Sequence, residues 1–151
     1  MAVRERQSAP LIVAEPPARY RRQSPLVVDC SVVSAVLFDE GEREAAARRI
    51  AAHGLYAPTL LDYEIASVAV KKQRGGMTSD QVELALSDYA ESDIELLGVN
   101  RGGVIAMARE YSLSAYDAAY LWLAAQLQAP LVTFDRKLGE AAQKHFSTLG
   151  D

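Results

Sequence analysis

The 151-residue chain has few of the residues that mark secreted or membrane proteins. Its only cysteine, Cys30, excludes an internal disulfide framework and is typical of a reducing compartment. No apolar run approaches the ~20 residues that span a bilayer. At the N-terminus, Leu11, Ile12 and Val13 are too few to form the apolar block of a secretory signal. We therefore expect a cytoplasmic protein without a membrane segment.

Basic residues are scarce outside the N-terminus. Residues 1–25 carry five arginines and two glutamates, a net charge of +3, whereas residues 26–151 carry 11 basic and 18 acidic residues, a net charge of −7. Affinity for nucleic acids comes largely from Lys and Arg on phosphates, so an acidic body does not by itself indicate such a partner. Either the partner is not a nucleic acid, or a group absent from the sequence, such as a divalent metal ion, offsets some carboxylates.

The composition is that of one globular domain. Residues AVILMFWYC make up 50% of the chain and DEKR 24%, which excludes wholesale disorder. Residues 1–24 contain three prolines and scattered arginines without a sustained period, and they predict a basic, flexible arm. Residues 25–151 are expected to form a single domain.

Short apolar runs alternate with helix-forming segments along this domain. Strands are expected at 26–28, 54–58, 94–99 and 130–134, and helices at 31–38, 41–53, 59–72, 78–92, 103–111, 115–128 and 136–145. The alternation predicts β-α-β units, and hence an α/β fold with a mostly parallel sheet. The tail after residue 145 is short, so a fifth strand would be stunted.

Three helix starts carry capping signals. Ser31 is expected to cap the helix at 31–38. Thr59 with Asp62, and Thr78 with Gln81, match the capping box, in which two side chains satisfy free N–H groups of the first turn.

Four carboxylates stand where they would meet at one edge of the sheet. They are Asp29 after the first strand, Glu64 in the first turns of the helix at 59–72, Asp117 in the first turn of the helix at 115–128, and Asp135 after the fourth strand. Ligands of open parallel sheets bind at the carboxyl ends of the strands. We therefore expect the four side chains to converge there.

Each acid also has a structural interpretation. Asp135 could simply cap the last helix, Asp117 could close a capping box with Ser114, and an isolated helical Glu64 is usually solvated. Asp29 is the hardest to explain in this way, because a carboxylate at the end of an apolar strand is poorly hydrated. Asp117 is next, because residues 118–125 are apolar on every side and predict a buried helix.

Taken together, the four charges need compensation. Two unit charges ~4 Å apart at an effective dielectric constant of ~20 repel by about 4 kcal/mol, so a bare cluster would take up protons. Mg²⁺ or Mn²⁺ would neutralise it, because hard cations choose oxygen ligands. Hydrated divalent ions in an acidic pocket suit phosphodiester hydrolysis, with water as the attacking group.

The acids lie in recognisable motifs, namely Val27-Val28-Asp29-Cys30-Ser31, the helix of Glu64, the segment SAYDAAYL at 114–121 and the segment LVTFDRKL at 131–138. These motifs resemble those of the PIN-domain ribonucleases, and among them the VapC-type toxins of bacterial toxin–antitoxin pairs. The resemblance covers about residue 26 to the C-terminus. It implies a three-layer α/β/α sandwich with a mostly parallel central sheet, and cleavage of RNA with Mg²⁺ or Mn²⁺. It also implies a homodimer and a small cognate antitoxin that occludes the site.

The resemblance also implies residue roles. Asp29, Glu64, Asp117 and Asp135 would be the catalytic, metal-binding acids, and the hydroxyls of Ser31 and Thr133 would support the site. Arg136 and Lys137, beside Asp135, are placed to contact RNA. Leu138 stands where some relatives carry a further acid, which favours one firm metal ion over two. A type II toxin that cleaves transfer or ribosomal RNA is the function expected.

Two other functions stay open. A phosphoacceptor receiver domain would share a parallel sheet with Mg²⁺, but it needs an Asp after the third strand, and the segment 94–100 ends without an acid. A PIN-like domain that binds partners without catalysis is the second alternative.

Residues outside the motifs receive structural interpretations. His53 and His145 are far from the acids in sequence and are expected on the surface or in packing contacts. Tyr116, Tyr120 and Trp122 are expected in the core or at a dimer interface rather than as base-stacking platforms.

Overall fold

The computed structural model describes residues 23–38 and 41–150. Its strands are β1 (Pro25–Val28), β2 (Gly54–Pro58), β3 (Glu95–Leu97) and β4 (Leu131–Val132), and they form one sheet in the order β3-β2-β1-β4. All three pairings are parallel, and β1 is the central strand, paired with β2 on one side and β4 on the other. The predicted parallel sheet is confirmed.

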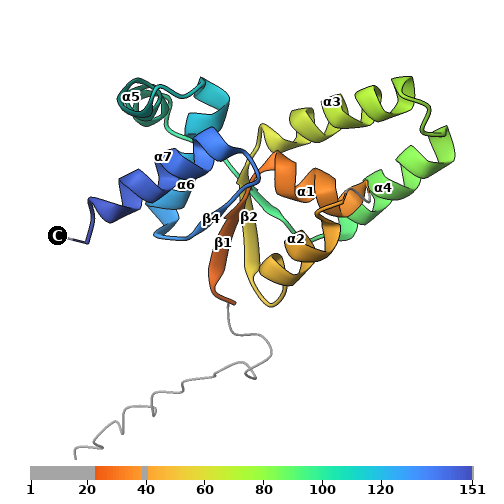
Figure 1. Ribbon diagram of the computed structural model, residues 1–151, viewed down its shortest axis with the longest axis horizontal. Helices are drawn as coiled ribbons and strands as arrows, with labels where there is room; N and C mark the ends of the chain where they lie inside the picture. Colours follow the sequence, from red (N-terminus) through yellow and green to blue (C-terminus); the bar gives the residue numbers. More distant parts are fainter. Residues whose placement is uncertain (1–22, 39–40, 151) are drawn as a thin grey trace, which may run out of the picture.

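Helices cover both faces of the sheet, as Figure 1 shows. One layer contains α1 (Cys30–Leu37), α2 (Arg43–Ile50), α3 (Leu61–Arg74) and α4 (Ser79–Glu91), and the other contains α5 (Arg101–Tyr111), α6 (Ala115–Leu127) and α7 (Arg136–Ser147). Parallel crossovers are right-handed, so connections that run from β1 toward β3 lie on one face. The connection that returns from β3 to β4 lies on the other. The expected three-layer α/β/α sandwich is confirmed.

The core lies between β1 and α6. Leu26, Val27 and Val28 are fully buried, which agrees with a central strand covered on both faces. Helix α6 is buried along most of its length, as its all-round apolar sequence predicts. Helix α5 approaches it closely at Gly103, where a side chain would overlap the indole of Trp122.

Two of the three predicted caps are wrong. Helix α1 begins one residue earlier, with Asp29 as its cap, because the Asp29 carboxylate accepts the Val32 N–H at 3.3 Å. Helix α3 begins at Leu61 without a side-chain cap, and Asp62 accepts a hydrogen bond from the Tyr89 hydroxyl at 2.8 Å instead. The capping box of Thr78 and Gln81 at the start of α4 is confirmed.

Strand β4 is shorter than the predicted 130–134, and β3 is shorter than 94–99. Pro130 has no N–H, and the N–H groups of Phe134 and Asp135 donate to side-chain hydroxyls rather than to a neighbouring strand. Strand pairing therefore ends where the residues after β4 turn toward the end of β1. From β4 to residue 150 the described chain adds no fifth strand.

The predicted arm falls mostly outside the described residues, which begin at Gln23. Among the described residues, no helix combines the length and the apolar character needed to cross a bilayer.

Candidate active site

Asp29 is the only buried charged residue in the described part of the chain, with 5% of its surface exposed. Its Oδ1 accepts hydrogen bonds from the Ser31 hydroxyl at 2.6 Å and from the Val32 N–H, and its Oδ2 accepts one from the Thr133 hydroxyl at 2.6 Å. Burial raises the pKa of Asp29 above its ordinary value, although these donors oppose the effect. Together with the Ser31 backbone N–H, these donors satisfy most of the roughly four acceptor positions of the carboxylate.

The hydroxyls of Ser31 and Thr133 join the end of β1 to the loop after β4. Each hydroxyl has one proton and donates it to Asp29. Each also accepts a backbone N–H from the loop: Ser31 from Phe134 at 2.9 Å, and Thr133 from Asp135 at 2.9 Å. The two predicted supporting hydroxyls thus fix both the Asp29 carboxylate and the backbone that carries Asp135.

Glu64 is half-buried at the start of α3, and its Oε1 accepts a hydrogen bond from the Tyr120 hydroxyl at 2.7 Å. Burial raises the pKa of Glu64, the Tyr120 hydroxyl opposes this, and the charges of Asp29 and Asp117 raise it further. Tyr120 is 1% exposed and its phenol has a strongly raised pKa, so the hydroxyl stays protonated and remains a donor. The expectation of a core tyrosine is confirmed, but its contact with Glu64 was missed. A signal was available, because Tyr120 lies three residues after Asp117 and therefore on the same face of α6.

Asp117 and Asp135 complete the group. The backbone N–H of Asp117 donates to the Ser114 hydroxyl at 3.1 Å, and Asp135 caps α7 by accepting the Leu138 N–H at 2.8 Å. The capping interpretation of Asp135 is therefore correct. Burial first, and then the charge of Asp135, raise the pKa of Asp117, while Lys137 lowers it. Asp135 therefore both caps α7 and lies close enough to Asp117 for its charge to act there.

The four acids are linked by their charges into one group. The charges of Asp29 and Asp117 raise the pKa of Glu64, and the charge of Asp135 raises the pKa of Asp117. They come from the residue after β1, the starts of α3 and α6, and the residue before α7, all at the carboxyl edge of the sheet. The charges thus link the four acids in the order Asp29, Glu64, Asp117 and Asp135, each within electrostatic range of the next.

The chemistry of this group suits a hard divalent cation. Among the described residues, no three His, Cys, Asp or Glu side chains form a ready-made metal cage. Mg²⁺ does not require one, because it is usually held by one or two carboxylates and keeps several waters. Carboxylates that repel one another fit such an ion, because hard cations choose oxygen ligands.

The two predicted RNA contacts differ. Arg136 forms an ion pair with Glu140, one turn along α7, with 2.8 Å between Nε and Oε1. Lys137 is exposed and lies close enough to Asp117 to lower its pKa. Lys137 is therefore the basic side chain whose charge acts on the acidic group.

The histidines have the structural roles expected of them. His145 Nδ1 forms a hydrogen bond with the Tyr111 hydroxyl at 2.8 Å, which links α7 to α5. His53 Nδ1 lies 3.2 Å from the Ser24 carbonyl oxygen. Tyr116, expected in the core or at an interface, is 68% exposed beside Asp117.

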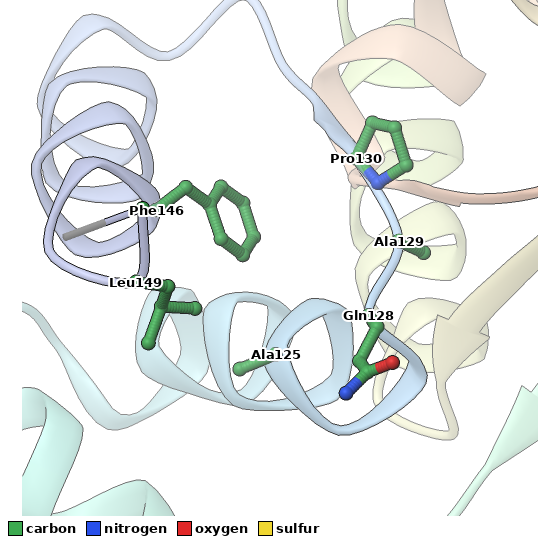
Figure 2. Close-up of a pocket in the computed structure, with 7 residues that line it drawn as sticks. Ala125, Gln128, Ala129, Pro130, Phe146 and Leu149 are labelled. Carbon is green, nitrogen blue, oxygen red and sulfur yellow. The ribbon is translucent and has the colours of Figure 1, made fainter.

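A hollow larger than the pocket at Glu64 lies elsewhere. A cavity of about 580 Å³ opens between the C-terminal ends of α6 and α7, with Phe146 and Leu149 facing Ala125 and Pro130 (Figure 2). Pro130 precedes β4, so this hollow lies at the amino edge of the sheet. None of the described residues that line it is ionisable. A smaller pocket of about 470 Å³ lies beside Glu64 and is lined by Leu60, Tyr63, Glu64, Ser67 and Tyr116.

Comparison with known proteins points to one family. The PIN domain family profile matches residues 26–144. VapC ribonuclease Mb0985 of Mycobacterium bovis is 35% identical over 124 residues, which cover 78% of this chain and 91% of that protein. Ribonuclease VapC3 of Pyrobaculum aerophilum is 30% identical over 121 residues, which cover 76% of this chain and 92% of that protein.

A solved structure agrees with the fold. The crystal structure of PAE2754 from Pyrobaculum aerophilum has a TM-score of 0.58 and 21% sequence identity, and the match covers 84% of this chain and 96% of that chain. Profile, relatives and fold agree, and so the chain belongs to the PIN-domain family, in its VapC ribonuclease branch.

Proposed function

We propose that the protein is a metal-dependent endoribonuclease that acts as the toxin of a type II toxin–antitoxin system. The observation that carries the proposal is the coupled group of Asp29, Glu64, Asp117 and Asp135 at the carboxyl edge of the sheet. Such a group is unfavourable in a bare folded protein and becomes favourable when a divalent cation neutralises it. The relatives named VapC ribonucleases support RNA as the substrate.

Asp29 and Asp117 would hold the ion, with Glu64 and Asp135 completing its surroundings. A bound Mg²⁺ or Mn²⁺ supplies Lewis-acid chemistry at the scissile phosphate. Asp29 is held in one orientation by the hydroxyls of Ser31 and Thr133.

Glu64 has the properties of a residue that orients the attacking water. The Tyr120 hydroxyl fixes one of its oxygens and leaves the other available. Its raised pKa makes it a better proton acceptor than an ordinary glutamate. The charge of Asp135 acts on Asp117 and not on Glu64. The Asp135 side chain is held in place because it caps α7.

The partners follow from the same proposal. A transfer or ribosomal RNA would be the substrate, a small cognate antitoxin would cover the acids, and two copies would form a homodimer in the cytoplasm. An antitoxin that covers the acids would have to present cationic groups to them, because the four carboxylates repel any anionic segment.

The receiver-domain alternative does not fit the topology. In flavodoxin-like receiver folds β1 lies between β2 and β3, whereas here it lies between β2 and β4. No acid ends β3, which is followed by Gly98, Val99 and Asn100. The non-catalytic alternative shares the PIN fold, so activity has to separate it from the proposal.

The test is RNA cleavage by protein purified without antitoxin. Cleavage is expected with Mn²⁺, with products that carry 5′-phosphates because water rather than a ribose hydroxyl attacks. Cleavage should stop with EDTA and in Asp29→Asn, and continue in Asp88→Asn, which changes an exposed acid of α4. Equal cleavage in all samples would indicate a contaminant and contradict the proposal.

A further inference from the structure

Exposed aromatic side chains occur in one place only among the described residues. Tyr63, Tyr116 and Phe134 are 81%, 68% and 46% exposed, and every other exposed large hydrophobic residue there is aliphatic. Each of the three directly precedes an acid of the site, namely Glu64, Asp117 or Asp135. They come from three separate segments of the chain, so one local sequence preference does not account for the pattern.

Two of these rings share a pocket with Glu64, one of the four acids. Tyr63 and Tyr116 line the pocket of about 470 Å³ that also contains Glu64, with Leu60 and Ser67 as its other lining residues. This volume lies in the range of roughly 300–1,000 Å³ that is typical of small-molecule sites. The pocket therefore places apolar ring surface beside a carboxylate of the site.

The third ring is held on the loop after β4. The Phe134 N–H donates to the Ser31 hydroxyl, which in turn donates to Asp29. The backbone of Phe134 is therefore fixed relative to Asp29, while its ring stays exposed. Exposed apolar surface beside a site is a common feature of binding surfaces.

We propose that Tyr63, Tyr116 and Phe134 are stacking platforms for unpaired bases of the RNA substrate. The inference rests on the proposed function and assigns substrate-binding residues to it. Proteins that read single strands stack bases on aromatic rings while cations track the phosphates, and Lys137 supplies a cation beside Asp117. A double helix, whose bases are already stacked on one another, offers these rings no free base face.

The occupant favoured by the structure is RNA rather than a second protein copy. The rings adjoin three of the four acids, and a permanent interface with a second copy would bury the mutually repelling carboxylates at a desolvation cost and close the site to substrate. Substrate backbone, by contrast, needs access to these acids. The dimer interpretation is kept as an outcome of the test.

The experiment uses an Asp29→Asn protein, in which cleavage is prevented, and fluorescence anisotropy with two probes. One probe is a short single-stranded RNA of mixed sequence, and the other is the same sugar–phosphate chain without bases. We expect the first to bind at least about tenfold more tightly, because stacking is worth ~1–3 kcal/mol per base. Tyr63→Ala and Tyr116→Ala should each reduce this preference about tenfold, and Phe134→Ala should reduce it less. Tyr63→Phe and Tyr116→Phe, which keep the ring, should retain it.

Leu149→Ala is the matched control, because Leu149 is 66% exposed at the far edge of the sheet and should leave the preference unchanged. Equal binding of both probes by a protein that cleaves RNA would overturn the stacking inference alone. Binding of neither probe would overturn the proposed RNA substrate and the inference with it. A dimer that dissociates on Tyr63→Ala or Tyr116→Ala in sedimentation would assign the rings to a protein interface and overturn the inference.

Discussion

The amino and carboxyl edges of the sheet differ in the size of their pockets and in the charge of the residues there. The amino edge has the larger hollow, about 580 Å³, lined by residues such as Ala125 and Phe146 and by no ionisable group among those described. The carboxyl edge has the smaller pocket, but four carboxylates gather there, and one of them is almost completely buried.

The difference shows that chemistry, rather than the size of a hollow, locates the site. Apolar side chains at the ends of packed helices belong to the interior of a folded protein, so a hollow lined by them has a structural explanation. Acids whose charges raise the pKa values of Glu64 and Asp117 have no such explanation, because their repulsion opposes folding. Proteins tolerate such local cost where function requires it.

The largest expected effect on this difference between the edges comes from neutralising the buried acid, Asp29. Asp29→Asn should lower RNA cleavage by more than about 100-fold, a larger loss than the 10–100-fold typical of residues that only support a metal ligand. Asparagine is as good a helix cap as aspartate, so the fold should persist. Cleavage rates and thermal melting of purified protein measure both effects, and full activity in Asp29→Asn would contradict the assignment.

Removal of a supporting hydroxyl should give the next largest effect. Tyr120→Phe deletes only the donor to Glu64 Oε1, and Thr133→Val deletes the donor to Asp29 Oδ2. Each should lower cleavage about 10–100-fold and cost about 1–3 kcal/mol in unfolding free energy. If the hydroxyls acted only on stability, cleavage measured well below the melting temperature would be unchanged.

A smaller effect concerns stability without metal. Burial and neighbouring charge raise the pKa values of Asp29, Glu64 and Asp117 in the folded state. The folded protein then binds protons more tightly than the unfolded chain, so its stability penalty is full above the raised pKa values. The penalty shrinks as the pH falls through them, and it disappears below the ordinary carboxyl range near about 4.

Melting in EDTA at neutral and mildly acidic pH measures this penalty. Asp117→Asn should raise the melting temperature at neutral pH by up to about 2–4 °C, since such partly exposed charge pairs are worth ~1 kcal/mol or less. The gain should diminish as the pH is lowered. A melting temperature that falls on Asp117→Asn would show that the acids stabilise one another through hydrogen bonds instead.

The smallest effect on activity is expected at the amino edge. Phe146→Ala removes a half-buried ring from the larger hollow and should lower the unfolding free energy by about 1–3 kcal/mol. Cleavage at a temperature where the variant is folded should stay within about twofold of wild type. A loss of cleavage comparable to that of Thr133→Val would show that the two edges act together.

Most of the fold could be predicted because local patterns agreed with the tertiary structure. The apolar run at Leu26–Val28 and the all-apolar helix after Asp117 predicted the buried strand and helix at the centre of the core. The helix starts at Ser31 and Thr59 were misassigned, because capping patterns do not show which side chain is recruited elsewhere. Ser31 turns to Asp29, and Asp62 binds Tyr89.

The candidate acids and the hydroxyls of Ser31 and Thr133 could be named from the sequence, but the contacts of Tyr120 and the exposure of Tyr116 could not. The four carboxylates follow strands or open helices, and parallel topology brings such positions to one edge. The Tyr120–Glu64 hydrogen bond joins residues 56 positions apart in the sequence. The exposure of Tyr116 depends on how α3 packs beside the start of α6. Contacts of this kind follow from packing, which periodicity does not encode.

The most direct measurement of the central claim is a calorimetric titration of Mn²⁺ into metal-free protein. The account predicts saturable uptake by wild type, loss of uptake in Asp29→Asn and Asp117→Asn, and unchanged uptake in Asp88→Asn. Absence of uptake in wild type, or equal uptake in all four proteins, would contradict the claim that these carboxylates form a divalent-cation site.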